Sequence, residues 1–267
     1  MSIIKLSALV VAHNEERILE ECLKRLMFAD ELVVVLDKCT DRSSAIAQKY
    51  TENIIEGNWE IEGERRNIGI DNCRGEWILE ADADEWITES LAVEIRETID
   101  KSEYDLHDIP VKNYIGDHYV KYGWGGGSFG KEYTLNLYRK GTKSWGNARV
   151  HPHLTVTGEM GPALNNSLEH YMDANISAMI GRLDRYTTYR AKDLAEADEI
   201  GSLANNFRKF ISRFLKVYIR RKAYKEGGYG FMNALCSGLY PLISHVKATN
   251  EEQNLRPSNG SNKSRMR

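Results

Sequence analysis

The chain has 267 residues, of which 42% are hydrophobic and 28% are charged, a composition typical of a globular protein with a sizeable core. The formal net charge of −3 argues against a nucleic-acid-binding protein, since such proteins are usually basic. Four cysteines in a chain of this length argue against a disulfide scaffold, and no pair has the CxxC spacing of a zinc site, so the sequence predicts reduced thiols in a cytoplasmic protein.

The N-terminal part of the chain alternates between strand and helix patterns. Short apolar runs are typical of buried parallel strands, and apolar residues at helical spacing lie between them. The predicted strands cover residues 6–12, 31–36, 53–55 and 77–80, and the predicted helices lie within residues 15–26, 43–50, 64–73 and 91–99. This order predicts an open, mostly parallel sheet with helices on both faces.

Three polar segments follow predicted strands, at residues 13–15, 37–41 and 82–85. Ligands of open α/β sheets bind beyond the carboxyl ends of the strands, so we expect these segments on one rim. Asp82 and Asp84 stand one residue apart, and both can face a divalent cation. Mg²⁺ and Mn²⁺ prefer such oxygen ligands, supplemented by substrate phosphates. The position after a strand favours this metal site over the alternative, an acidic turn that caps the next helix.

Other polar residues of the same segments suit a nucleotide. Asp37 can accept hydrogen bonds from a base or a ribose, whereas Asp41 fits helix N-capping before Ser43. Arg65 and Arg66 stand near the start of a predicted helix. The planar guanidinium group suits phosphate oxygens, and the alternative for Arg65 is an exposed basic turn.

The pattern changes after about residue 104. Strand-like runs at residues 106–111, 134–138 and 150–157 are broken by glycines. Gly125–Gly127 can form a loop that closes over bound donor and excludes water, with Trp124 stacking on a sugar. The alternative is an ordinary hairpin loop.

Residues 173–249 are predicted to be helical, and the polar residues 250–267 are predicted to be disordered. Residues 205–225 hold eight Lys or Arg and no acid, with apolar residues at three- and four-residue steps. This pattern predicts a basic amphipathic helix on an anionic membrane surface. The alternative is a helix that packs its apolar stripe on the catalytic domain. Gly230–Val246 is too interrupted to span a bilayer, which needs about 18 apolar residues, and a homodimer contact is left open.

Three motifs in order, SALVVAHNEE, LVVVLDKCTDRS and ERRNIGIDNCRGEWILEADADEWIT, resemble glycosyltransferase family 2. The later segments IPVKNYIGDHYVKYGW, LNLYRK, ARVHPHL and LEHY are similar to a branch of bacterial lipopolysaccharide-core β-glucosyltransferases. The resemblance implies an α/β fold of the GT-A type, with a Rossmann-like, mostly parallel sheet and a C-terminal helical extension. It divides the chain into a nucleotide-sugar-binding half at residues 1–104, an acceptor-binding half at 105–172 and the extension at 173–249.

The resemblance also implies the reaction. We expect an inverting, metal-dependent transfer from a nucleotide-diphosphate sugar, with UDP expected, to a cell-envelope glycan such as lipopolysaccharide core or a lipid-linked saccharide. The enzyme would be cytoplasmic, peripheral on the inner face of the cytoplasmic membrane. The alternative is a non-catalytic nucleotide-sugar-binding module of the same fold. A nucleotide-sugar pyrophosphorylase is rejected, because its Gly-rich basic loop is replaced here by residues 13–16, HNEE.

The resemblance implies that residues at matching positions of these motifs have the roles of the family's site residues. The implied donor-binding residues are Ala12, Asn14, Glu15, Asp37, Arg66, Asn67 and Asp82, to which the loop argument adds Trp124. Asp82 and Asp84 are the implied metal ligands, with Asp84 the more direct. Leu36 stands where the family has the first aspartate of its second loop, so one familiar contact is absent.

Inversion requires a general base that deprotonates the acceptor hydroxyl. Relatives often have Val-His-Glu where this chain has Val150-His151-Pro152-His153, so the glutamate is missing. Glu132 lines up roughly with an acidic position in the loop after the Gly-Trp motif and is the first candidate, with His151 the second. The alternatives are a surface charge for Glu132 and a structural histidine for His151.

Overall fold

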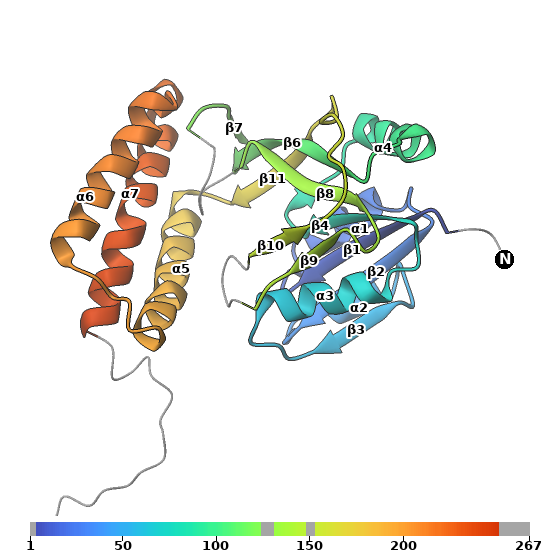
Figure 1. The fold of residues 1–267 in the computed structure, drawn as a ribbon, viewed down its shortest axis with the longest axis horizontal. Coiled ribbons are helices and arrows are strands. Elements are labelled where there is room, and N and C mark those ends of the chain that lie inside the picture. The colour runs from blue at the N-terminus through green and yellow to red at the C-terminus, as the bar shows by residue number, and fades with distance from the viewer. Residues whose placement is uncertain (1–3, 124–130, 148–152, 251–267) are drawn as a thin grey trace, which may run out of the picture.

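The computed structural model describes residues 4–123, 131–147 and 153–250, and places a helical unit beside an α/β unit (Figure 1). The strands are β1 (Leu6–Ala12), β2 (Glu31–Asp37), β3 (Ile54–Gly57), β4 (Trp77–Asp82), β5 (Glu85–Trp86), β6 (Leu106–Ile115), β7 (His118–Val120), β8 (Tyr133–Arg139), β9 (Lys143–Trp145), β10 (Leu154–Val156) and β11 (Leu168–Asp173). The α-helices are α1 (Leu19–Arg25), α2 (Ser43–Ala47), α3 (Glu62–Asn72), α4 (Glu89–Lys101), α5 (Ile176–Glu196), α6 (Leu203–Leu215) and α7 (Gly227–Asn250).

The central sheet has a parallel half and a mixed half. Its strand order is β3-β2-β1-β4-β8-β6-β11-β5, with β7 paired to β6. β3, β2, β1 and β4 run parallel, β8 is antiparallel to both β4 and β6, and β11 is parallel to β6. The α/β class and the predicted strands of the N-terminal part are confirmed. The sequence did not predict β5, β7, β9 and β11, three of which have only two or three residues.

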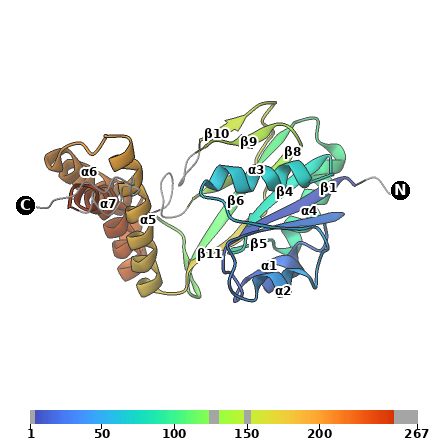
Figure 2. The same cartoon turned by 90° about the horizontal axis from the view of Figure 1, so that it is seen from below.

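Alternation along β1 explains how the sheet is covered. Val10 belongs to the core that contains α1 and α4, whereas its neighbour Leu9 packs with Ile70 of α3. Successive side chains of a strand point to opposite faces, so both faces of an apolar strand need a cover. Figure 2 accordingly shows α3 on one side of the sheet and α1 and α2 on the other.

The C-terminal helices pack on the mixed half of the sheet. Met179 and Leu183 of α5 and Cys236 of α7 share a core with Ile115 of β6 and Val120 of β7. α7 packs against both α5 and α6, and near its start Tyr229 stacks on His118 of β7, whereas α6 lies farthest from the sheet (Figures 1 and 2). The predicted helical segment is interrupted: a π-helical turn at Lys216–Arg220 and a 3-10 helix at Ala223–Glu226 join α6 to α7.

Within the described residues, no helix combines the length and apolar character needed to cross a membrane. α7 contains Pro241 and several polar residues, which agrees with the interruptions seen in the sequence. The predicted disordered tail lies, apart from Asn250 at the end of α7, outside the described residues.

Candidate active site

The loops after β1 and β2 are tied together by side chain to backbone hydrogen bonds. The backbone N–H of Thr40 donates to Oδ1 of Asn14 at 2.8 Å, and the N–H of Glu15 donates to Oγ of Ser43 at 3.0 Å. Asn14 has a φ of 56°, in the left-handed region that asparagine tolerates better than most residues. Two of the predicted donor-binding residues therefore also shape the rim of the sheet.

Ala12 is buried at the end of β1, and its carbonyl accepts a hydrogen bond from the Cys39 thiol at 3.6 Å. Cys39 thus links the ends of β1 and β2. The backbone of Ala12 forms part of the rim, whereas its methyl group lies in the core.

Asp37 ends β2 and is 5% exposed. Its Oδ1 accepts from the backbone N–H of Trp59 at 2.9 Å, and its Oδ2 lies 2.8 Å from Nη1 of Arg65. Both oxygens are therefore engaged by the segment leading into α3. Arg65 is not the exposed basic turn of the alternative interpretation, because it holds this carboxylate.

Arg66 of α3 sits between two carboxylates. Its Nη2 lies 2.9 Å from Oδ1 of Asp82, its Nε lies 3.0 Å from Oε1 of Glu62, and its guanidinium carbon lies 4.9 Å from the ring centroid of Trp145. Partial burial would raise the pKa of Asp82, but the charge of Arg66 outweighs it and holds that pKa well below the ordinary value. Asp82 is therefore ionised and already paired with a cation.

Asn67 exchanges two hydrogen bonds with the backbone of Trp145. Its Nδ2 donates to the Trp145 carbonyl at 2.8 Å, and its Oδ1 accepts from the Trp145 N–H at 2.9 Å. This clamp joins α3 to β9 and fixes the indole on which Arg66 stacks. In this structure the amide of Asn67 supports Arg66 through Trp145.

Asp84 and His170 meet at the edge of the site. Nε2 of His170 lies 3.4 Å from Oδ2 of Asp84, and Nδ1 lies 3.1 Å from Oδ1 of Asn113. The Asn113 oxygen can only accept, so Nδ1 carries the hydrogen and Nε2 faces Asp84. Burial would lower the pKa of His170, but the Asp84 carboxylate outweighs it and raises that pKa above the ordinary value.

This pair fits a divalent cation. A carboxylate oxygen and an imidazole nitrogen are both accepted by Mn²⁺, and Mg²⁺ is usually held by one or two protein ligands plus phosphates and water. In the described part of the chain, no three His, Cys, Asp or Glu side chains gather into a metal cluster. A cation held by Asp84 and His170 would take its remaining ligands from a bound diphosphate and water.

The pKa of Glu15 reflects the high density of negative charge at this rim of the sheet. Burial, together with the nearby carboxylates of Asp84, Asp41 and Asp82, raises its pKa to about 7. A cation bound at Asp84 would relieve this repulsion, which supports the same fit. The positive charge of Arg185 on α5 opposes the shift.

Glu85 belongs to the segment 82–85, for which the alternative was an acidic turn that caps the next helix, but its side chain is completely buried. Its Oε1 lies 2.5 Å from Nζ of Lys131, and its Oε2 accepts from Asn136 at 3.0 Å and from the Asp82 N–H at 3.2 Å. Burial would lower the pKa of Lys131, but Glu85 and Asp82 raise it above the ordinary value. The ammonium group thus adds a fixed positive charge beside the two aspartates.

The three remaining predicted site residues are Glu132, Trp124 and His151. Glu132 is exposed immediately before β8, next to Lys131, and its carbonyl accepts a hydrogen bond from the Val111 N–H at 2.9 Å. Trp124 and His151 lie outside the described residues. Sequence reasoning missed His170 and Lys131, although His170 stands in the LEHY segment that contributed to the resemblance.

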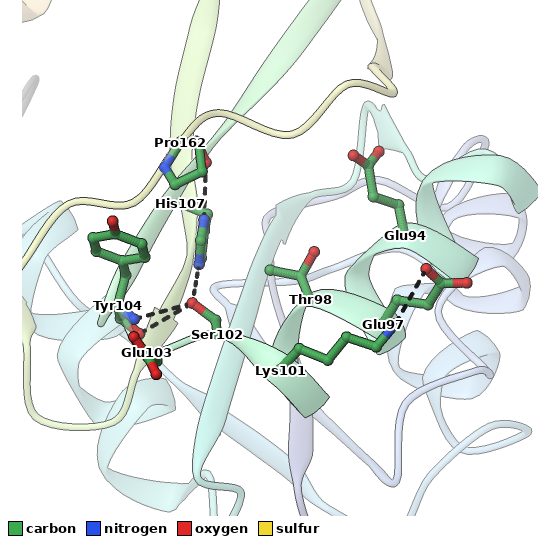
Figure 3. A pocket seen from close by; sticks show the side chains of 9 residues that line it. All are labelled: Glu94, Glu97, Thr98, Lys101, Ser102, Glu103, Tyr104, His107 and Pro162. Atoms are coloured by element: carbon green, nitrogen blue, oxygen red, sulfur yellow. Dashed lines mark hydrogen bonds and ion pairs between the residues drawn. The ribbon is translucent and has the colours of Figure 1, made fainter.

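A pocket of about 440 Å³ lies away from these residues, where α4 ends and β6 begins (Figure 3). That edge holds the amino end of β4, opposite the rim described above. Ser102 Oγ lies 2.7 Å from Nε2 of His107, whose Nδ1 lies 2.9 Å from the Pro162 carbonyl. The carbonyl can only accept, so both ring nitrogens are engaged in joining neighbouring loops. No predicted site residue lines this pocket.

Comparisons with known proteins cover most of the chain. The family model described as Glycosyl transferase family 2 matches residues 7–154. The lipopolysaccharide core biosynthesis glycosyltransferase LpsC of Rhizobium meliloti is 24% identical over 257 residues, covering 91% of each chain. An uncharacterized glycosyltransferase of Rickettsia felis is 25% identical over 244 residues, covering 86% of this chain and 84% of that one.

Among solved structures, Staphylococcus aureus TarS 1-349 in complex with UDP-GlcNAc aligns with a TM-score of 0.51. The two chains are 16% identical, and the alignment covers 94% of this chain and 90% of that one. At this identity the likeness concerns the fold.

Proposed function

Because the chain belongs to glycosyltransferase family 2 and has the GT-A fold, we propose that it transfers a sugar from a UDP-sugar to a cell-envelope glycan with inversion at the anomeric carbon. The observation that carries the proposal is the meeting of Asp84 and His170, beside the Asp82–Arg66 pair, on the carboxyl rim of the parallel strands. Ligands of such sheets bind at this rim.

The donor diphosphate would lie against the rim, where Asp84 and His170 would hold a Mg²⁺ or Mn²⁺ ion. The ion would supply Lewis-acid stabilisation of the charge that develops on the leaving diphosphate. Arg66 keeps Asp82 ionised and oriented, and Lys131 adds a positive charge to the same region. UDP as the nucleotide is supported by the UDP-GlcNAc complex of TarS, whose fold is similar.

Glu132 is the proposed general base, with His151 as the second candidate. A general base must accept the proton of the attacking hydroxyl as the new bond forms, and an exposed carboxylate next to the rim can meet an acceptor that enters from solvent. Glu132 follows Lys131 directly in the chain, and Lys131 contacts Glu85 behind the two aspartates.

The acceptor proposed is a glycan of the lipopolysaccharide core. The supporting observation is the similarity to LpsC, which extends over 91% of both chains and so includes the acceptor half and the helical unit. A lipid-linked saccharide is the second acceptor class. The competing hypothesis, a non-catalytic nucleotide-sugar-binding module, differs in one measurable property: it would bind donor without hydrolysing or transferring it.

A donor panel tests the proposal. The protein is mixed with UDP-, GDP-, dTDP- and ADP-sugars with and without Mn²⁺, and thermal stabilisation and slow donor hydrolysis are measured. We expect a UDP-sugar to stabilise the protein only with metal, and Asp84→Ala to abolish this stabilisation. The matched control is Glu97→Ala, which removes an exposed carboxylate on α4.

Three outcomes would count against parts of the proposal. Wild-type affinity of Asp84→Ala for metal and nucleotide would refute the metal site. Stabilisation by a different nucleotide sugar would refute the UDP assignment. Binding without hydrolysis or transfer to lipopolysaccharide core or lipid-linked saccharide would favour the non-catalytic module.

A further inference from the structure

Helix α6 and the π-helical turn after it expose a row of large apolar side chains. The row recurs at every fourth residue, and each member is between 43% and 58% exposed: Leu203, Phe207, Ile211, Leu215 and Ile219. Large apolar side chains are normally buried, and a contiguous exposed row marks an interaction surface. We call these five residues the α6 row.

The α6 row is distinct from the face with which α6 packs. Phe210 contacts α7 closely at Gly238, Phe214 stacks edge-on against Phe231, and Val217 is buried. The apolar residues at three- and four-residue steps within 205–225, which the sequence predicts to share one stripe, include Phe207, Phe210, Ile211, Phe214 and Leu215. The structure divides that stripe, because α7 covers only one side of it.

Basic side chains flank the α6 row. Arg208, Lys209, Arg213, Lys216 and Arg220 are all exposed. No acidic residue occurs among residues 205–225, although the chain as a whole has a net charge of −3. An apolar row bordered by cations, without anions, matches the chemistry of a membrane interface: acyl chains accept the apolar groups and anionic headgroups attract the cations.

The surface faces away from the catalytic unit. α6 packs on α7 rather than on the sheet, and it lies at the far end of the helical unit in the view of Figure 1. A flat partner could therefore contact α6 without covering the carboxyl rim of the parallel strands. The helix is also too short and too charged to span a bilayer, so it would lie in the plane of the surface.

We propose that the α6 row and its basic flank dock the protein on an anionic lipid bilayer. A second copy of the chain fits this surface less well, because a symmetric contact through α6 would bring two clusters of Lys and Arg together. The surface lies outside the donor site, so this inference can fail while the proposed function holds, and the reverse is also true.

Vesicle co-sedimentation tests the docking. We expect the full chain to pellet with vesicles of equimolar phosphatidylglycerol and phosphatidylcholine, much less with phosphatidylcholine alone, and less again at high salt, because screening shortens the reach of the headgroup charge. Ile211→Glu with Leu215→Glu should lower the vesicle affinity by about tenfold or more, since two apolar anchors become anions. Reversal of Lys209, Arg213 and Lys216 to Glu should have a comparable effect.

The matched control is Val93→Glu, which introduces the same charge at a position on α4 that is 60% exposed. It should bind vesicles as the wild type does. All variants should unfold cooperatively near the wild-type melting temperature, which verifies that each one is folded. The docking proposal is refuted if the wild type does not bind anionic vesicles, or if the Ile211→Glu, Leu215→Glu variant binds them as the wild type does. Self-association that the same substitutions abolish, without vesicle binding, would assign the surface to a second copy and also overturn the proposal.

Discussion

Nε2 of His170 lies 3.4 Å from Oδ2 of Asp84, although the two residues are far apart in the chain. They meet because β11 pairs antiparallel with β5, which places His170 opposite Glu85. A further hydrogen bond, from the Tyr171 N–H to the Asp84 carbonyl at 2.8 Å, holds the two segments together. Asn113 on β6 then orients the imidazole. The candidate metal site thus combines a loop after the parallel strands with a strand of the mixed half.

Replacement of His170 by Ala should weaken the metal-dependent binding of UDP. We expect about a tenfold or larger loss in apparent Mn²⁺ affinity, because loss of even an outer-shell partner of a metal ligand costs about 10–100-fold. Titration of Mn²⁺ against a fixed UDP concentration, followed by thermal shift, measures the change. His118→Ala is the control, since His118 stacks on Tyr229 outside the site. An unchanged Mn²⁺ titration would show that His170 does not contribute to metal binding.

Asp37 should prove important for stability as well as for donor binding. Asp37→Ala leaves the Trp59 N–H and Arg65 without their acceptor, which costs about 1–3 kcal/mol for a buried group. Thermal unfolding without ligand measures this part, and UDP titration measures the donor contact. Asp37→Asn is the control, because it keeps an oxygen for the Trp59 N–H. A normal melting temperature for Asp37→Ala would contradict the anchoring role.

Glu132→Gln should slow sugar transfer while leaving donor affinity unchanged. General base catalysis contributes about 10²–10⁴-fold to a rate, and Gln cannot accept the proton. Turnover is measured with saturating donor, and the donor Kd is measured separately by thermal shift. Glu103→Gln, beside the pocket on the opposite edge of the sheet, is the control. Near-normal turnover would exclude Glu132 as the general base. His151→Gln would then be tested in the same way.

Glu31 should make part of the stability pH-dependent. Its Oε2 accepts from the Ser7 hydroxyl at 2.5 Å, and its Oε1 lies 2.6 Å from Nε of Arg74. Burial would raise the pKa of Glu31, but these hydrogen bonds outweigh it and hold the pKa below its ordinary value. A carboxylate whose pKa falls on folding stabilises the protein above its unfolded pKa of about 4.3, and this contribution is lost as pH falls below that value.

Glu31→Gln should therefore lower the melting temperature at neutral pH by a few degrees, since about 1 kcal/mol corresponds to roughly 2–4 °C at this chain length. The difference from wild type should shrink in acid, where wild-type Glu31 becomes protonated. Melting curves from neutral to acidic pH measure it. The exposed carboxylate Glu97→Gln should show no such pH dependence, and a constant difference for Glu31→Gln would contradict the account.

The sequence predicted the parallel half of the sheet nearly residue by residue. Its prediction for residues 6–12 matches β1, and residues 31–36 and 77–80 fall within β2 and β4. These strands are buried on both faces, so each one is a short apolar run that local pattern detects. Asp82 and Asp84 were located for the same reason, because they directly follow β4 and the position of a strand end follows from the run before it.

The mixed half of the sheet depends on contacts between residues that are distant in the sequence, and no local pattern predicts such contacts. β11 has the sequence LEHYMD, in which apolar and polar residues do not alternate, so neither the strand nor the approach of His170 to Asp84 was predictable. Glu85 looked like a turn residue, and only the packing of β8 brings Lys131 and Asn136 to it.

Helix α6 shows the same division between sequence and structure. Its sequence established that the helix is amphipathic and basic, since residue spacing alone determines which side chains share a face. Only the position of α7 decided which apolar residues are buried and which form the exposed α6 row, because burial depends on a partner surface that another part of the chain supplies. The sequence alone thus determined the family, the parallel strands and the acidic motif. The tertiary structure decided which distant side chains meet that motif and which apolar surface stays exposed.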